Sequence, residues 1–495
     1  MRFPTTLLAL LIFCMGQAQD SAQVKSKVRK SIDMLGGFVS IPNDALDIAD
    51  INRNITWLTE AFNQRGFNSS VLPTSGAPLF FAALPMEDSK PTILFYMHLD
   101  GQGVDASKWD QNDPYQMIIK AQQGDSLVVK EKSDLNSDLN YDWRLFGRST
   151  ADDKGPIVMF LNAIDLLQEN GVELAYNIKV ILDSEEEKGS KPLPKAVAEY
   201  KELLQADFLV INDGPMHASG QPTIVYGCRG ITGISLTTYG PIKPQHSGHY
   251  GNYTPNPAME LSQLLASMKD AEGRITIKGY YDGIKIDADT KALLEAVPDD
   301  VEAIKASQQL GRVDLVGQSY QEALQYPSLN IRGMQSAWVG DQTRTIVPDK
   351  ATAEIGIRLV PETDGARLQN LIQKHISNQG YTVLDHEPST DERTQNERIV
   401  KLTNGSISNA FRTDMENPNG QFLRDKLAQL SEAEVVNIRM MGGTVPMAPF
   451  IKQLGIPAFI VPLVNHDNNQ HAPNENLRIG QLDYGIRVFY GILSK

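Results

Sequence analysis

At 495 residues the chain is too long for one ordinary hydrophobic core, so we expect two or more domains. Its composition is that of a soluble globular protein, and its formal net charge of −14 argues against a nucleic-acid partner. No internal segment approaches the ~18–20 continuous apolar residues of a membrane span, so we expect none.

The N-terminus has the pattern of a secretory signal peptide. In "MRFPTTLLALLIFCMGQAQD" an arginine precedes an apolar run, and small residues precede a cleavage point after Ala18. We therefore expect residues 1–18 to be removed and the protein to be exported, to a periplasm or the extracellular space. Removal leaves Cys228 as the remaining cysteine, which excludes an intrachain disulfide.

Residues 19–227 alternate helices with apolar strands. The expected helices are "VRKSIDMLGGFVSI", "NITWLTEAFNQRG" and "GPIVMFLNAIDLLQENG", and the expected strands are "PTILFYM", "NIKVILD" and "ADFLVIND". This alternation predicts an α/β domain with a helix-covered, mostly parallel sheet.

Near Gly227 the pattern changes. An alternating strand "GITGISLTTYG" and a helix "NPAMELSQLLASMKD" precede "TRTIVPDKATAEIGIRLV", which we interpret as two strands around a Pro-Asp-Lys turn. A helix "GARLQNLIQKHISNQG" and a strand "YTVLDHE" follow. This order suggests an α+β module of the split-βαβ, ferredoxin-like kind, inserted as residues 228–411. The first pattern resumes over residues 412–495.

The strand "PTILFYM" runs into His98 and Asp100. Residues two apart on an extended chain point to the same face, and functional groups collect at the carboxyl ends of strands in open α/β sheets. The pair can share a metal ion or a proton. Taken alone, such a pair more often consists of polar surface residues than of metal ligands.

Four further segments place acidic groups or histidines beside strand ends and helix starts. Singly, each has a structural explanation, because acidic pairs cap helices, a glutamate run is usually a solvated face and a lone histidine is usually structural. Together, five strand ends of one sheet deliver groups that bind hard or borderline metals, which favours a metal site. The groups are Asp152 and Asp153, then Glu185, Glu186 and Glu187, then Asp213, and finally His466 and His471.

With these motifs the sequence resembles the dinuclear-zinc amidohydrolases. That family includes carnosinase-type dipeptidases, glutamate carboxypeptidases, aminoacylases, and acetylornithine and succinyl-diaminopimelate deacylases. The matching motifs are "HLD", "ADDKGP", "EEKGS", "IND", "HSG" and "QHAPNEN", in the family's order and spacing. The likeness spans essentially the whole chain after residue 18. It implies a catalytic α/β domain and an inserted lid and dimerisation domain.

The resemblance implies two Zn²⁺ ions per chain, with Mn²⁺ or Co²⁺ as alternatives. Asp152 would bridge the ions, and Asp100 would orient His98. Glu186 would be the general base acting on a metal-bridged hydroxide, and "EEKGS" favours it over Glu185. The remaining ligands would be His98 with Asp213 at one ion, and Glu187 with His471 at the other.

The resemblance also implies site residues outside the α/β domain's metal ligands. His246 of "HSG" would reach the active site of a partner subunit in a homodimer and stabilise an oxyanion there. The match is imperfect, because Asn252 stands where the family often has a second glycine. Arg358 would bind the substrate's carboxylate, with a strand-surface charge as the alternative. The loop "RMMGGTVP" would line the substrate pocket through Gly442, Gly443 and Thr444.

The leading hypothesis is a secreted metal-dependent hydrolase that cleaves the amide bond of dipeptides or short peptides, a dipeptidase or exopeptidase. The alternative is an N-acyl-amino-acid deacylase. The resemblance favours the peptidase, because Asp213 rather than a glutamate is the last acidic ligand. A non-catalytic peptide-binding relative is remote, because no core position is missing. The side-chain preference of the substrate stays open.

Overall fold

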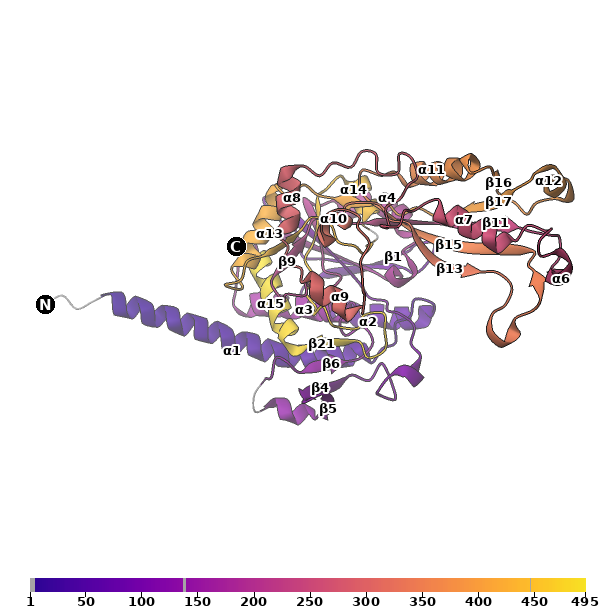
Figure 1. Ribbon diagram of the computed structural model, residues 1–495. Coiled ribbons are helices and arrows are strands. Elements are labelled where there is room, and N and C mark those ends of the chain that lie inside the picture. Colours follow the sequence, from indigo (N-terminus) through magenta and orange to yellow (C-terminus); the bar gives the residue numbers. More distant parts are fainter. Residues whose placement is uncertain (1–4, 137–138, 446) are drawn as a thin grey trace. The chain divides into compact units, whose positions relative to one another are not determined.

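The computed structural model describes residues 5–136, 139–445 and 447–495 (Figure 1). Their contacts divide the chain into two units. The first unit comprises the residues up to Tyr226 together with Thr413–Asn437 and Pro449–Lys495, and the second comprises Gly227–Arg412 with Ile438–Ala448. The catalytic and dimerisation roles expected for the domains stay predictions.

The first unit is built on a sheet of eight strands in the order β1-β2-β7-β3-β8-β20-β9-β19. The neighbours β7, β3, β8 and β20 run parallel, whereas β1, β2 and β9 are paired antiparallel. The strands are β1 (Asn68–Leu72), β2 (Leu79–Ala83), β3 (Thr92–His98), β7 (Asn177–Asp183), β8 (Phe208–Ile211), β9 (Thr223–Val225), β19 (Val436–Ile438) and β20 (Ala458–Ile460).

Helices cover both faces of this sheet. On β3, the ring of Phe95 lies 5.4 Å from Phe160 of α3 (Lys154–Glu169) and 5.7 Å from Phe489 of α15 (Ile479–Leu493). The next residue, Tyr96, points the other way, and its ring lies 5.7 Å from that of Phe450 of α14 (Ala448–Leu454). Both faces of β3 and β7 are therefore buried, which explains why their sequences are apolar without alternation. The predicted α/β fold class is confirmed.

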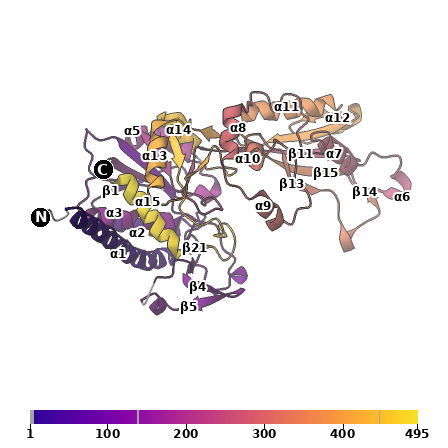
Figure 2. The same ribbon diagram turned by 60° about the vertical axis from the view of Figure 1, so that its left-hand side comes forward.

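Several helices of the first unit pack on one another as well as on the sheet. In Figures 1 and 2, α1, α3 and α15 lie side by side, and they share one hydrophobic core. The helices of this part of the chain are α1 (Thr5–Val39), α2 (Ile48–Asn63), α3 (Lys154–Glu169), α4 (Leu193–Glu199), α5 (Lys201–Leu204), α13 (Pro418–Ala428), α14 (Ala448–Leu454) and α15 (Ile479–Leu493), with 3-10 turns η1 (Ala106–Lys108), η2 (Lys132–Asn136) and η3 (Glu186–Lys188).

A smaller antiparallel sheet in the same unit has the order β21-β6-β4-β5. Its strands are β21 (Asn476–Arg478), β6 (Arg144–Phe146), β4 (Ile118–Gln123) and β5 (Ser126–Lys130). Pairing of β21 with β6 brings the segment after His471 beside the segment before Asp152. Two loops far apart in the sequence are thereby fixed next to each other.

The second unit is an α+β module with the sheet order β13-β15-β11-β17-β16. Strand β11 alternates buried and partly exposed residues, as its sequence predicts. Helices α7 and α11 pack on this sheet (Figure 2). The strands are β11 (Gly230–Tyr239), β13 (Asn330–Gln335), β15 (Lys350–Leu359), β16 (Thr382–Leu384) and β17 (Ile399–Asn404), and the helices are α6 (Ser247–Tyr250), α7 (Pro257–Ala266), α8 (Ala288–Glu295), α9 (Val301–Ser307), α10 (Tyr320–Ala323), α11 (Gly365–Asn378) and α12 (Thr390–Gln395), with the 3-10 turn η4 (Gly340–Gln342).

Two details of this sheet differ from the sequence prediction. The two strands expected around the Pro-Asp-Lys turn are present, but they do not pair with each other, because β15 already lies between β13 and β11. The preceding short strand β14 (Ile346–Val347) pairs instead with β12 (Gln245–His246). Strand β17 was not predicted, and it separates β16 from β11. A separate ribbon joins β10 (Gly227–Cys228) to β18 (Phe411–Arg412).

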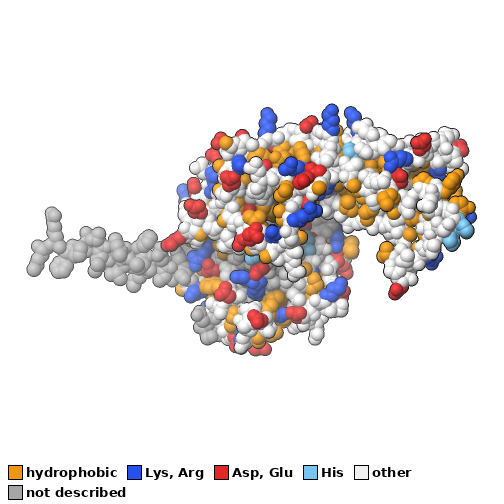
Figure 3. Space-filling view, viewed as in Figure 1, with side chains coloured by type: hydrophobic (Ala, Val, Ile, Leu, Met, Phe, Trp, Pro, Cys, Tyr) orange, Lys and Arg blue, Asp and Glu red, His pale blue; other side chains and the backbone are white. Residues whose placement is uncertain are grey.

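Among the described residues, no helix combines the length and apolar character needed to cross a membrane. The segment expected to be a signal peptide falls largely outside this description, because residues 1–4 and the side chains of residues 5–21 are not described. Figure 3 shows hydrophobic and histidine side chains gathered over α6, at one end of the second unit.

Candidate metal centre

The carboxyl ends of three neighbouring parallel strands meet at one edge of the main sheet. Strand β3 ends at His98, β7 leads into the turn η3, and β8 is followed by Asp213. The loop before α3 adds Asp152, and the segment between β20 and β21 adds His471. Residues from five segments of the sequence thus converge because parallel strands share one functional edge.

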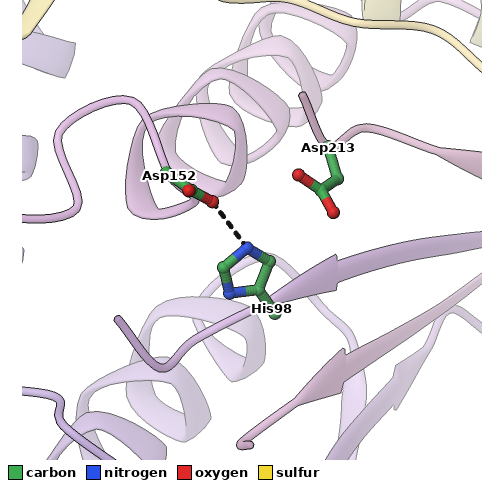
Figure 4. A group of neighbouring side chains, drawn as sticks. All are labelled: His98, Asp152 and Asp213. Atoms are coloured by element: carbon green, nitrogen blue, oxygen red, sulfur yellow. Dashed lines mark hydrogen bonds and ion pairs between the residues drawn. The ribbon is translucent and has the colours of Figure 1, made fainter. Parts of the chain in front are cut away.

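His98, Asp152 and Asp213 form a first group of possible ligands (Figure 4). Their candidate ligand atoms lie within 4.8 Å of one another, and all three side chains are buried. Nε2 of His98 is 2.8 Å from Oδ1 of Asp152. Burial raises the pKa of Asp213 to about 6, because a charged carboxylate loses its hydration there.

Asp152, Glu187 and His471 form a second group. Nε2 of His471 lies 3.1 Å from Oδ2 of Asp152 and 3.2 Å from Oε2 of Glu187. Asp152 therefore turns one oxygen toward each histidine. Burial opposes its ionisation, yet hydrogen bonds from His471 and His98 hold the pKa of Asp152 below its usual range.

The donor set fits two divalent cations. The ligands are carboxylates and imidazoles, which suit Zn²⁺, Mn²⁺ and Co²⁺. Oδ2 of Asp152 is buried, and apart from its ion pair with His471 at 3.1 Å it has no partner among the described residues, so it keeps a lone pair for a metal. Several buried carboxylates in one place repel one another, and a cation would offset that repulsion.

Asp100 contacts one residue of each ligand group, His98 of the first and Glu187 of the second. Its backbone carbonyl oxygen lies 3.1 Å and its Oδ1 3.4 Å from Nδ1 of His98, and these contacts turn Nε2 of that ring toward Asp152. Its two carboxylate oxygens also accept hydrogen bonds from the backbone N–H groups of Glu186 and Glu187, at 3.0 and 3.1 Å. The sequence predicted only the contact with His98. Burial raises the pKa of Asp100 to about 6.

The three consecutive glutamates have different environments. Glu185 accepts a hydrogen bond from the backbone N–H of Ala77 at 2.7 Å, so its carboxylate is engaged in local structure. Glu187 belongs to the second group of ligands. Glu186 stands between them in η3, and burial, followed by the charge of Asp213, raises its pKa well above the usual value. His466 is not in either group.

Sequence reasoning missed Glu475, which is fully buried beside the centre. Its Oε1 accepts hydrogen bonds from the backbone N–H groups of Ala151 and Asp152, at 2.9 and 3.0 Å. Its Oε2 accepts from Ser149 N–H at 2.9 Å and from Nη1 of Arg148 at 2.7 Å. The motif "QHAPNEN" contains Glu475, but nothing in that string distinguishes a ligand from a loop-holding carboxylate.

The remaining predicted residues lie in the second unit. Arg358 is on β15, and its Nη1 contacts Oγ1 of Thr444 in the glycine-rich loop, next to Gly442 and Gly443. His246, at the start of α6, is exposed, and its ring lies 4.9 Å from that of His249. The structure therefore joins Arg358 to Thr444.

A pair of ligand groups that share one carboxylate, at the carboxyl edge of an α/β sheet, defines the class as a metal-dependent hydrolase. The model of peptidase family M20/M25/M40 matches residues 94–495, and the chain belongs to this family. The resemblance predicted from the motifs is confirmed, and the chain is a metallopeptidase.

Similar proteins agree with this assignment. A Cys-Gly metallodipeptidase of Candida albicans is 26% identical over 423 residues, covering 84% of this chain and 81% of that protein. The human Beta-Ala-His dipeptidase is 26% identical over 423 residues, covering 83% and 76%. Among solved structures, an M20 family metallo-carboxypeptidase from Sulfolobus solfataricus has a TM-score of 0.76 at 25% identity, covering 93% of this chain and 98% of that one.

Proposed function

We propose that the chain is an exported dipeptidase that cleaves the amide bond of dipeptides or short peptides with two divalent ions per chain. The observation that carries the proposal is Asp152, whose two oxygens face two separate groups of ligands. The similar Cys-Gly and Beta-Ala-His dipeptidases support dipeptides as the substrate class.

His98 and Asp213 would hold one ion, Glu187 and His471 the other, and Asp152 both. When bound, Zn²⁺, Mn²⁺ or Co²⁺ would polarise the amide carbonyl and activate a water molecule. Asp100 fixes Nε2 of His98 toward the site by its contact with Nδ1.

Glu186 is the proposed general base. A carboxylate that is not itself a ligand can accept a proton and return it to the departing amine. The raised pKa of Glu186, caused first by burial, brings it toward the range in which such transfer is efficient. The bond from Ala77 N–H to Glu185 supports Glu186 over its neighbour.

Arg358 would bind the substrate's terminal carboxylate, assisted by Thr444 and by the backbone of Gly442 and Gly443. A planar guanidinium suits a carboxylate because it can donate two parallel hydrogen bonds. The contact of Arg358 with Thr444 supports a shared role for the strand and the loop.

We also propose a homodimer through the second unit, in which His246 serves the partner subunit's site and stabilises the oxyanion. The exposure of His246 supports this role, as do exposed apolar side chains close to it in the sequence, namely Ile242, Tyr250 and Tyr253. The secretory pattern of residues 1–18 supports export to a periplasm or the extracellular space.

The test uses residues 19–495, freed of metal and reloaded with Zn²⁺, Mn²⁺ or Co²⁺. A panel of dipeptides is compared with a panel of N-acetyl-amino acids, with and without a chelator. We expect metal-dependent cleavage of dipeptides, loss of that activity in Asp152→Asn, and full activity in the control Asp142→Asn at an exposed site. Preferential cleavage of N-acetyl-amino acids would make the chain a deacylase, and peptide binding without cleavage would make it a binding protein.

A further inference from the structure

Arg229, between β10 and β11, is a buried arginine without an acidic partner. Its side chain is 7% exposed, and Nη2 donates a hydrogen bond to the carbonyl of Tyr326 at 2.6 Å. Its Nε is buried and has no hydrogen-bond partner among the described residues. Among the described residues of the second unit, the ion pairs found join other residues and include neither Arg229 nor Arg358. A buried charge without a counterion is costly, so this arrangement favours an anion.

The hydrogen bonds of Arg229 reach both segments that flank Arg358. On one side, the guanidinium donates a hydrogen bond to the backbone carbonyl of Tyr326. Two residues later, the N–H of Ser328 donates to the carbonyl of Arg358 at 3.1 Å. Oγ of Ser328 in turn accepts a hydrogen bond from the N–H of Arg358 at 3.2 Å. On the other side, the backbone N–H of Arg229 donates to Gly443 at 3.1 Å, next to Thr444.

The two guanidinium groups also affect each other electrostatically. Burial, and then the charge of Arg358, lower the pKa of Arg229 to about 10, so both groups are cationic at neutral pH. Arg229 lines a cavity of about 220 Å³ together with Tyr320, Tyr326 and Ser328, so it borders open space. Two like charges that affect each other in a partly buried place are best balanced by a carboxylate.

We propose that Arg229 is a positioning residue that holds Arg358 and adds a second positive charge, and so restricts the site to substrates with a free C-terminal carboxylate. The inference rests on the proposed function, in which Arg358 binds that carboxylate. It predicts that Arg229 discriminates between an acid and its amide, which a merely structural clamp on Tyr326 would not do.

The experiment compares alanyl-alanine with alanyl-alaninamide in the metal-loaded wild type, Arg229→Gln, Arg229→Lys and the control Arg367→Gln. Arg367 also donates to two backbone carbonyls in the second unit, those of Gly279 and Asp282, so it matches the structural part of the role. Steady-state kinetics give kcat and KM, and an NMR titration with a ¹³C-labelled carboxylate measures binding without turnover.

For Arg229→Gln we expect the affinity for the acid to fall by about 10- to 100-fold, mainly in KM, with the amide changed by less than about threefold. Arg229→Lys should recover most of the selectivity, and Arg367→Gln should not change it. Equal losses for acid and amide, or unchanged selectivity, would overturn the inference. If the wild type cleaves neither compound, the proposed function fails, yet the NMR selectivity still decides the role of Arg229.

Discussion

The backbone N–H of Asp152 donates a hydrogen bond to Oε1 of Glu475 at 3.0 Å, and Glu475 is fully buried. This contact joins the loop before α3 to the loop before β21. The carboxylate also accepts from Ser149 and Ala151, so it fixes the backbone that presents Asp152. The geometry of the bridging ligand therefore depends on a residue that is not a ligand.

Replacing Glu475 by glutamine should weaken metal binding by about 10- to 100-fold, as loss of a residue that holds a metal ligand typically does. The amide NH₂ cannot accept hydrogen bonds from the N–H groups that the carboxylate binds. The free energy of unfolding should therefore also fall by about 1–3 kcal/mol. Metal affinity is measured by competition with a chelator. The control Glu362→Gln breaks an ion pair with Arg412 elsewhere and should keep full affinity. Equal affinity in Glu475→Gln and the wild type would contradict the positioning role.

Glu186→Gln should keep both metals and reduce turnover by about 10²–10⁴-fold, because it removes the proposed base and preserves shape. The neighbouring Glu185→Gln is the matched control, since Glu185 accepts a hydrogen bond from the backbone of Ala77 and belongs to neither ligand group. It should retain most turnover. A Glu186→Gln protein with near-normal kcat would rule out this base and direct attention to Glu185.

Metal binding should release protons, and His471 explains why. Hydrogen bonds to Asp152 and Glu187 raise the pKa of His471 to about 10 in the metal-free protein. The unfolded value is about 6.5, so this protonation stabilises the metal-free fold below that pH and ceases to do so as pH rises through about 10. A histidine must be neutral to bind a metal, so the apparent metal affinity should rise by about tenfold per pH unit between these values. Calorimetry in two buffers of different ionisation enthalpy measures the released proton. Proton-neutral binding at pH 8 would refute the assignment of His471.

His246→Ala should lose about 10²–10³-fold in turnover with unchanged metal content, as loss of one oxyanion donor does. If His246 serves a partner subunit, mixing inactive His246→Ala with inactive Glu186→Gln should restore partial activity, because exchanged dimers contain one complete site. The control mixture, Glu186→Gln with Asp152→Asn, should stay inactive, since each lesion disables the metal centre of its own subunit and no exchanged dimer contains a complete site. No recovery after demonstrated subunit exchange would exclude the cross-subunit role.

The sequence predicted much of the fold because buried strands and capped helices are local patterns. The run before His98 is apolar since both faces of β3 are covered, and β11 alternates since one face is more exposed. Strand β17 and the pairing of β14 with β12 were missed, because pairing is set by which sheet edges are already occupied.

The candidate ligands were predictable because they follow strand ends and match a known set of motifs. Glu475 and Arg229 were not, since each acts through backbone groups brought close by the fold. Glu475 contacts the loop that contains Asp152, which lies 323 positions earlier in the sequence. Nothing in the local sequence of either residue marks that contact.

The central claim is that one carboxylate, Asp152, serves two metal ions. Titration of the metal-free protein with Zn²⁺, followed by metal analysis after gel filtration, tests it most directly. We predict two bound ions per chain in the wild type, with activity lost to a chelator and regained on reloading, and a marked loss of the second ion in Asp152→Asn. One ion per chain with full activity would contradict the account.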